Sequence, residues 1–278
     1  MGSPGFAVLA LEAFAHAHEV AAVYTRAPSQ SGRGLATAKT PVHAAAESLG
    51  IPVFTPASFR RDPAAVRELR ALAPDMIIVF AYALMLPREV LDIAPCVCVH
   101  PSLLPRWRGA NPIMRAMMAG DKITGVCLMQ MVEEMDAGAV YMRSEIEIGG
   151  RTRGELEEEI GALAAEMLVD LLRAELPRPA PQEGGPTFAN KLSPEETEID
   201  WSASPEEIAA KIMALSPAPG AWFKDKKGER IKVLRSAVGD AGVSGAIHFK
   251  GVELLTLQRE GRKPQNAAEF ARGYKLEF

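Results

Sequence analysis

The sequence of 278 residues is poor in cysteine and lacks long hydrophobic runs. Its 3 cysteines are an odd number, which excludes a disulfide framework and favours a reducing, cytoplasmic setting. The longest apolar run, residues 76–86, is shorter than the roughly 20 residues that a membrane-spanning helix needs. The apolar N-terminus contains Glu12 and no basic leader, so it indicates an amphipathic helix rather than a signal peptide. No membrane partner is therefore expected.

The lack of a large net positive charge and of nucleotide-binding motifs excludes two classes of function. The formal net charge of −4 excludes a chain that coats nucleic acid as a uniform polycation, although it leaves room for a local basic patch. No Walker A pattern is present, and no Gly-x-Gly-x-x-Gly motif follows an expected strand, so a nucleotide cradle is not indicated.

The first part of the chain alternates helix starts with short apolar runs. An N-cap residue precedes a proline at 3–4, 40–41, 62–63 and 111–112, which predicts a helix beginning at each pair. The expected strands lie at 19–25, 51–55, 75–82, 96–100, 124–131 and 137–148. A capping-box pattern at Thr152 and Glu155 opens a longer helix. This alternation predicts an α/β domain with a Rossmann-like, mostly parallel sheet.

The composition changes after this domain. Residues 177–186 are rich in proline and glycine and predict a linker. One helix at 204–215 and several short strands then predict a small C-terminal β-barrel, of the OB-like kind. The expected domains are therefore 1–176, a linker at 177–190, and 191–278.

The stretch "CVCVHPSLLPRWRG" at 96–109 ends an apolar strand in a histidine and a stiff loop. Because side chains alternate along a strand, Cys96, Cys98 and His100 share one face. These three could bind zinc, but ligands spaced two apart on one extended strand do not converge easily on an ion. No other cysteine and histidine cluster supplies a fourth ligand, so no metal is expected.

His100 has a candidate partner. Strand ends in an open parallel sheet face the ligand crevice, and Asp136 follows the strand 124–131 in a loop. We expect that loop at the equivalent end of a neighbouring strand, where a carboxylate would raise the pKa of the imidazole and orient it for acid–base chemistry. A structural histidine is the alternative interpretation of His100.

Basic residues allow two interpretations at each place where they gather. Arg106 and Arg108 either hold an anionic group or lie solvated on a structural loop. The run 224–235 holds six basic and two acidic residues, within a region 191–278 that nets +1 against −5 for 1–190. A polyanion is more readily bound there, although a charged hairpin for solubility explains this run alone.

At this point the motifs resemble a known family. "VHPSLLPRWRGANPI" followed by "MQMVEEMDAG" resembles the methionyl-tRNA formyltransferases, as do "YTRAPSQSGRG", "FAYALMLP" and "FANKLSPEETEIDWSASPEEIAAKIMALSPAPGAWF". The resemblance runs nearly end to end. It implies transfer of a formyl group from 10-formyltetrahydrofolate, the co-substrate, to the amino group of initiator methionyl-tRNA for translation initiation. It also implies a cytoplasmic enzyme, expected to be a monomer.

The resemblance assigns roles residue by residue. His100 and Asp136 match two catalytic residues, and Cys98 stands at the third position, where the family has asparagine. The expected folate-binding residues are Ser102, Leu103, Leu104, Pro105, Tyr82 and Leu86. The expected tRNA-binding residues are Arg33, Lys226, Lys227 and Arg230.

The sequence also departs from the family pattern. Cys98 is a weaker hydrogen-bond donor than an asparagine amide, and a cysteine that carries the formyl group as a thioester would be new chemistry. We expect the first strand of the family, before the "GSPGFA" turn, to be missing, which predicts unpaired strand edges. Two rival functions therefore remain, namely a catalytically impaired protein that binds tRNA or folate, and a formyltransferase acting on a nucleotide-sugar amine.

Overall fold

The computed structural model describes residues 1–31, 36–239 and 243–278. Its contacts group the chain into two compact units. The first comprises Met1–Arg108, Gly125–Glu145 and Glu158–Thr187, and the second comprises Gly109–Thr124, Ile146–Glu157 and Phe188–Phe278. Each unit consists of three separate segments of the chain, so this grouping does not test the expected domain boundaries. Those boundaries remain a prediction.

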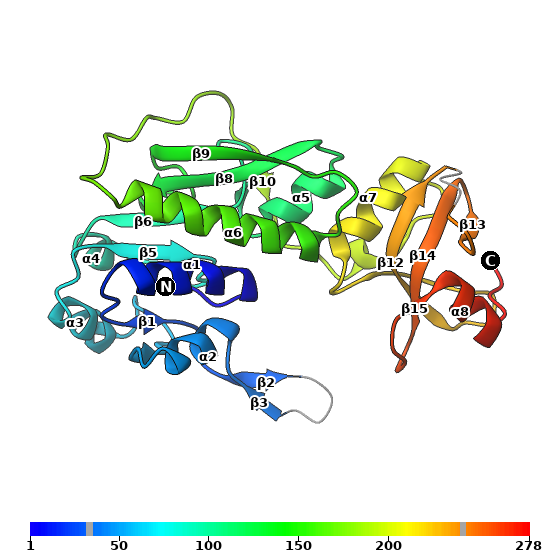
Figure 1. The fold of residues 1–278 in the computed structure, drawn as a ribbon, viewed down its shortest axis with the longest axis horizontal. Coiled ribbons are helices and arrows are strands. Elements are labelled where there is room, and N and C mark those ends of the chain that lie inside the picture. The colour runs from blue at the N-terminus through cyan, green and yellow to red at the C-terminus, as the bar shows by residue number, and fades with distance from the viewer. Residues whose placement is uncertain (32–35, 240–242) are drawn as a thin grey trace. The chain divides into compact units, whose positions relative to one another are not determined.

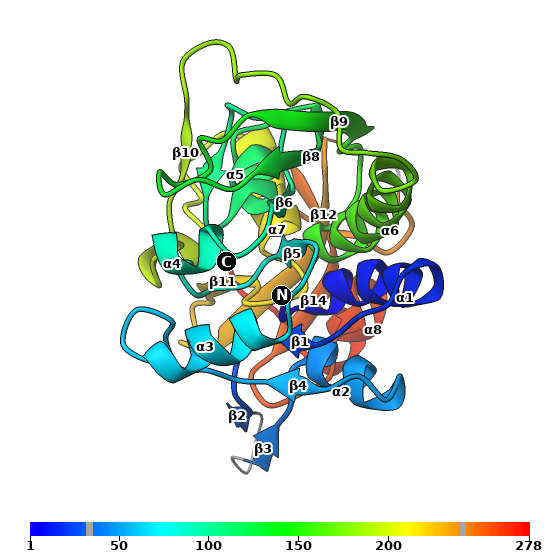
Figure 2. The same ribbon diagram turned by 90° about the vertical axis from the view of Figure 1, so that its left-hand side faces the viewer.

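The first unit contains most of the α/β elements. Its helices are η1 (Gly5–Ala7), α1 (Val8–Ala17), α2 (Pro41–Ser48), α3 (Pro63–Ala71), α4 (Arg88–Leu91) and most of α6 (Arg153–Leu171). Its strands are β1 (Val23–Tyr24), β2 (Ser29–Ser31), β3 (Ala36–Ala38), β4 (Val53–Phe54), β5 (Ile77–Phe80), β6 (Cys96–His100), most of β8 (Ile123–Gln130), and β9 (Val140–Glu147). Helices α1 and α6 lie side by side, with α3 and α4 on the other face of the strands (Figures 1 and 2).

The strand directions modify the expected sheet. Strand β1 pairs with β4 in parallel, and β5 pairs with β6 in parallel. The larger sheet has the order β5-β6-β8-β9, but β8 runs antiparallel to β6. The α/β class with a parallel core is confirmed, and the prediction of a parallel neighbour for β6 at 124–131 is wrong.

Local capping explains several helix starts. The side chains of Thr40 and Asp62 accept backbone N–H bonds at the starts of α2 and α3, as predicted. Thr152 and Glu155 cap α6 reciprocally, also as predicted. Ser3 does not cap a helix, because its hydroxyl lies 3.3 Å from Thr25 Oγ1 and accepts from the amide of Arg26.

The first two residues lie between β1 and β5. Gly2 donates its amide to the carbonyl of Tyr24, and the carbonyl of Met1 accepts from the amide of Phe80. Gly2 also forms a parallel bridge with Phe80. A cavity of about 680 Å³ adjoins this short bridge and is lined largely by apolar side chains, among them Leu69 and Leu168. The two strand edges are therefore joined by backbone over only this short length.

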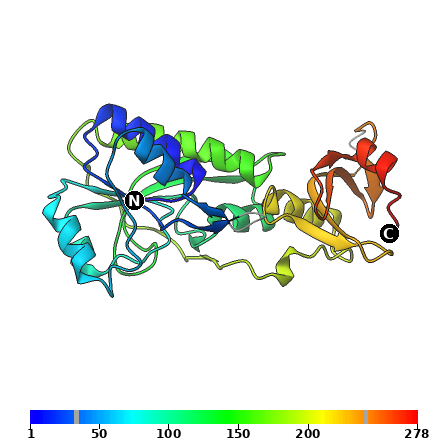
Figure 3. The ribbon, with the colours of Figure 1, turned by 90° about the horizontal axis from the view of Figure 1, so that it is seen from below.

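The second unit is built around antiparallel strands, which Figure 3 shows with α8 beside them. Its elements are α5 (Pro112–Met118), η2 (Glu195–Thr197), α7 (Pro205–Leu215), α8 (Ala267–Gly273), β10 (Phe188–Ala189), β11 (Ala221–Lys224), β12 (Arg230–Val238), β13 (Ile247–Phe249), β14 (Val252–Arg259) and β15 (Gln265–Asn266). The sheet order is β11-β12-β14-β13, with β15 against β14. A separate small C-terminal β unit is confirmed, and its closure into a barrel remains a prediction. The two-residue strand β7 (Arg108–Gly109) pairs with β10.

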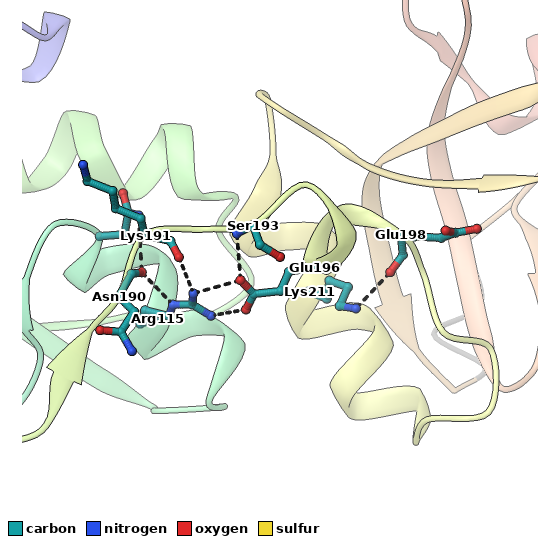
Figure 4. A network of polar contacts seen from close by, with 8 residues as sticks. Arg115, Asn190, Lys191, Ser193, Glu196, Glu198 and Lys211 are labelled. Carbon is teal, nitrogen blue, oxygen red and sulfur yellow. Dashed lines mark hydrogen bonds and ion pairs between the residues drawn. The ribbon is translucent and has the colours of Figure 1, made fainter.

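An arginine on α5 organises the start of the C-terminal segment (Figure 4). Arg115 donates to the carbonyls of Asn190 and Lys191 and forms a bidentate ion pair with Glu196. Glu196 also accepts the amide of Ser193 at 2.8 Å. These bonds together hold the pKa of Glu196 down at about 2, from an ordinary 4.5. The segment 190–196 is thus fixed by one guanidinium.

Candidate active site

Strand β6 positions two of the three expected catalytic residues. Cys98 lies opposite Met129 of β8, and His100 lies opposite Cys127. Residues directly opposite in an antiparallel ladder point to the same face of the sheet. Both Cys98 and His100 are buried, with 8% and 4% of their surface exposed. The end of β6 therefore presents its polar group in a largely dry environment.

Asp136 lies beside His100, but the backbone that places it there differs from the expected one. Its Oδ2 lies 3.7 Å from Nδ1 of His100, so the predicted pairing is present. However, β8 is antiparallel to β6, so its C-terminal end at Gln130 lies opposite Val97 and not at the histidine end. Asp136 adopts a φ of +50°, and Gly138 packs so closely on the carbonyl of Gln130 that a Cβ would clash. The turning loop after β8, rather than the strand end, brings the carboxylate to the imidazole.

The second ring nitrogen of His100 is also bonded. Nε2 lies 2.9 Å from the carbonyl oxygen of Trp107, and because a carbonyl only accepts, Nε2 carries the proton. Burial lowers the pKa of His100 below its usual 6.5, and the Arg108 cation lowers it further, against the opposing charge of Asp136. A neutral imidazole then presents an unprotonated Nδ1 toward Asp136, where it can accept a proton.

Cys98 is poorly suited to nucleophilic catalysis. Burial raises the pKa of its thiol far above the ordinary value, and the nearby charge of Asp136 raises it further. The thiolate is the nucleophilic form of cysteine, so the neutral thiol at this position is unreactive. Its neighbours are apolar, since it packs in a core cluster with Leu104 and Met129. The thioester alternative is therefore disfavoured on physical grounds.

The loop after β6 is stabilised from within. Ser102 is fully buried and donates to the carbonyl of Arg106 at 2.6 Å. Leu104 is also buried, whereas Leu103 and Pro105 are half-buried. The guanidinium of Arg106 lies 4.5 Å from the centre of the Trp107 ring. Of the expected folate-binding residues in this loop, Leu103 and Pro105 thus retain exposed surface.

The other two expected folate-binding residues lie in a different cluster. Tyr82 and Leu86 are buried in a core cluster with Phe59 and Ile77, whereas Cys98 belongs to another core cluster. The hydroxyl of Tyr82 is buried without a hydrogen-bond partner among the described residues. Burial raises the pKa of this phenol, so it stays protonated.

The segment 182–187, which the sequence predicts to be linker, contributes directly to this region. Thr187 accepts from the amide of Trp107 through its hydroxyl at 2.9 Å, and its own amide donates to the carbonyl of Pro105. Gln182 contacts both Arg108 and the loop at Asp136. Sequence reasoning missed both residues, and their only signal was a pair of polar side chains in a stretch otherwise rich in proline and glycine.

The expected tRNA-binding residues of the second unit lie at the turn between β11 and β12. Lys226, Lys227 and Arg230 are exposed. Arg230 stacks 4.0 Å from the centre of the Trp222 ring, and Lys227 pairs with Glu277 at 3.2 Å. Arg33, the fourth expected contact, lies outside the described residues.

The described residues contain no group of three or more histidine, cysteine or acidic side chains arranged for a metal ion. In the same parts of the chain, no helix has the length and apolar character needed to cross a membrane.

Comparison with known families agrees with this architecture. The family profile described as "Formyl transferase" matches residues 6–172, and "Formyl transferase, C-terminal domain" matches residues 191–249. A structure of HypX from Aquifex aeolicus with tetrahydrofolic acid is similar in fold, with a TM-score of 0.60 at 20% identity over 80% of this chain and 43% of that chain. A methionyl-tRNA formyltransferase structure from Clostridium thermocellum has a TM-score of 0.56 at 24% identity over 69% and 82%. The protein is thus a formyl transferase, a group-transfer enzyme.

Comparison with curated relatives shows to which family of formyl transferases the chain belongs. The methionyl-tRNA formyltransferase of Phenylobacterium zucineum is 45% identical over 295 residues, covering 98% of this chain and 95% of the relative. That of Paracoccus denitrificans is 43% identical, covering 99% and 97%. This chain belongs to the methionyl-tRNA formyltransferase family.

Proposed function

We propose that this chain transfers the formyl group of 10-formyltetrahydrofolate to the amino group of methionyl-tRNA, with His100 and Asp136 as catalytic residues. The observation that carries the proposal is the 3.7 Å approach of Asp136 Oδ2 to an unprotonated His100 Nδ1 in a buried setting. The full-length similarity to methionyl-tRNA formyltransferases supports the choice of substrates.

The chemistry follows from these two groups. The methionine amine attacks the formyl carbon, whose carbonyl oxygen gains negative charge. Nδ1 of His100 accepts a proton from the attacking nitrogen, and Asp136 stabilises the imidazolium that forms. The carbonyl of Trp107 keeps the ring in one orientation through Nε2. The bond between the formyl carbon and the tetrahydrofolate nitrogen then breaks, and that nitrogen takes the proton from the His100 imidazolium as the amide product forms.

Several finer assignments belong to the same proposal. Ser102, Leu103, Leu104, Pro105, Tyr82 and Leu86 are proposed to bind the folate, and Arg33, Lys226, Lys227 and Arg230 to bind the tRNA. The tRNA is proposed to be the initiator, and the enzyme to be a cytoplasmic monomer. The nucleotide-sugar alternative has only fold-level support, from structures such as a sugar N-formyltransferase of Shewanella at 19% identity.

The test is a formylation assay with charged initiator tRNA, using the native chain, His100→Gln and Asp136→Asn. Removing a general base typically costs a factor of about 10² to 10⁴, so His100→Gln should lose at least about a hundredfold in kcat. Asp136→Asn should also lower kcat, because the imidazolium then loses its stabilising carboxylate. Activity of His100→Gln within tenfold of the native chain, a margin of about 1.4 kcal/mol, would refute the catalytic assignment. If the native chain formylates a nucleotide-sugar amine and not methionyl-tRNA, the proposed substrate is wrong.

A further inference from the structure

The side-chain amide of Gln182 joins two pieces of the catalytic region. Its Nε2 donates to the carbonyl oxygens of Asp136 and Gly138, each at 2.8 Å. Its Oε1 accepts from Nε and Nη2 of Arg108, at 3.1 and 2.8 Å. A primary amide has two N–H donors and two acceptor lone pairs, so these four bonds use its full capacity.

The first pair of bonds supports a loop that holds an unfavourable conformation. Asp136 sits in the left-handed region at φ +50°, which persists only where surrounding contacts impose it. The carboxylate of this residue faces His100 across 3.7 Å. Gln182 bonds the carbonyl of Asp136 itself and that of Gly138 two residues on, so it fixes the loop on both sides of Ala137.

The second pair of bonds fixes a positive charge. The Arg108 side chain is only 11% exposed, and its cation lies near enough to lower the pKa of His100. Its acidic contact with Glu134 is 3.4 Å long and that carboxylate is 77% exposed, which makes the contact weak. Gln182 bonds the guanidinium through a neutral oxygen and therefore adds no negative charge beside it. A carboxylate at position 182 would neutralise it.

We propose that Gln182 is a positioning residue, which sets the places of Asp136 and Arg108 around His100 through one amide. The inference rests on the proposed catalytic roles of His100 and Asp136. The sequence places Gln182 in a stretch expected to be linker, 46 residues beyond Asp136 and 74 beyond Arg108. The segment 177–187 is therefore part of the catalytic unit in function as well as in contacts.

The test compares Gln182→Met and Gln182→Glu with Glu183→Met, which changes an exposed neighbour in the same segment. Met keeps the length of the side chain and removes all four bonds. Glu keeps an acceptor for Arg108 but cannot donate to the two carbonyls. Since a misplacement near 1 Å can cost about a hundredfold, both Gln182 variants should lose about tenfold to a hundredfold in kcat. The KM for methionyl-tRNA and that for the folate should change by less than about twofold, because binding surfaces remain.

A second readout does not depend on turnover. Histidine Cε1–H resonances report each imidazole's titration, and the chain has 5 histidines. The His100 midpoint should move in Gln182→Met and stay unchanged in Glu183→Met. In Gln182→Glu the midpoint should rise, because the added carboxylate offsets the Arg108 charge that lowers it.

The outcomes separate this inference from the proposed function. Unchanged kcat and unchanged His100 titration in both Gln182 variants would overturn the inference, as would a loss confined to KM. If His100→Gln loses activity while Gln182→Met does not, only the inference fails. If His100→Gln keeps its activity, the catalytic assignment itself fails, and the positioning role falls with it.

Discussion

Oδ2 of Asp136 and Nδ1 of His100 lie 3.7 Å apart, slightly beyond hydrogen-bond distance, on a buried strand end. This spacing suits a pair that shares a proton only during reaction. Nδ1 keeps its lone pair for the incoming amine, and the carboxylate is close enough to stabilise the cation that results.

Cys98→Asn is expected to increase kcat. A thiol is a weak donor, and an amide at the same position supplies an N–H to the oxyanion that forms. One such donor is typically worth about 10² to 10³ in rate. The measurement is single-turnover formylation of charged initiator tRNA. Cys98→Ala is the control and should match the native rate, since neither side chain donates strongly. A native rate within about tenfold of the Asn variant would show that another donor serves the oxyanion.

Arg108→Met is expected to raise the pKa of His100, and Asp136→Asn to lower it. The Arg108 cation disfavours the imidazolium, whereas the Asp136 carboxylate favours it. Proton NMR titration of the free native and variant proteins measures both shifts. Shifts of the same sign in the two variants would contradict the arrangement described here.

Glu196→Gln is expected to lower stability at neutral pH and to have little effect in strong acid. The folded-state pKa of Glu196 is about 2 against an ordinary 4.5, so its contribution is complete above about pH 4.5 and is lost as the pH falls toward 2. With 35% of the side chain exposed, we expect a loss of about 1 kcal/mol in the free energy of unfolding at pH 7.

Urea denaturation at several pH values measures this difference. Glu198→Gln is a suitable comparison, because it removes a nearby exposed carboxylate that has no ion pair with Arg115. A difference between native and Glu196→Gln that stays constant from pH 7 to 2 would exclude the Arg115 ion pair as its source.

Lys226→Ala and Arg230→Ala are expected to weaken tRNA binding and flatten its salt dependence. Each lost phosphate contact should reduce the slope of log K against log salt by about 0.7 to 0.9. Filter binding at several salt concentrations measures the slope. Lys263→Ala, exposed between β14 and β15, should leave it unchanged. A uniform slope in all variants would exclude this hairpin from the tRNA contact.

Much of this arrangement could be predicted from local sequence, and the exceptions have a common cause. The caps at Thr40 and Asp62 depend on residues within three positions, so a short pattern specifies them. The pairing of His100 with Asp136 was predicted correctly, but from a parallel β8 that is in fact antiparallel. Strand direction depends on how the chain connects in space, which apolar periodicity does not encode.

The contacts of Gln182 are a second feature that local sequence patterns do not predict. Its partners lie 44 to 74 residues earlier in the chain, and the prolines and glycines around it predict a linker. Prolines and glycines are compatible with an extended segment, but they do not predict which residues that segment contacts. No local sequence pattern therefore predicts that the Gln182 side chain contacts the catalytic region.

The bond between Trp107 and Thr187 spans 80 residues of sequence. During synthesis, the loop that orients His100 leaves the ribosome well before the segment that fastens it. The nascent chain must therefore hold this loop without its final partners until residues 182–187 have emerged. The hydrogen bond from the Trp107 amide to Thr187 therefore forms only after the segment that leads into the C-terminal unit has been translated.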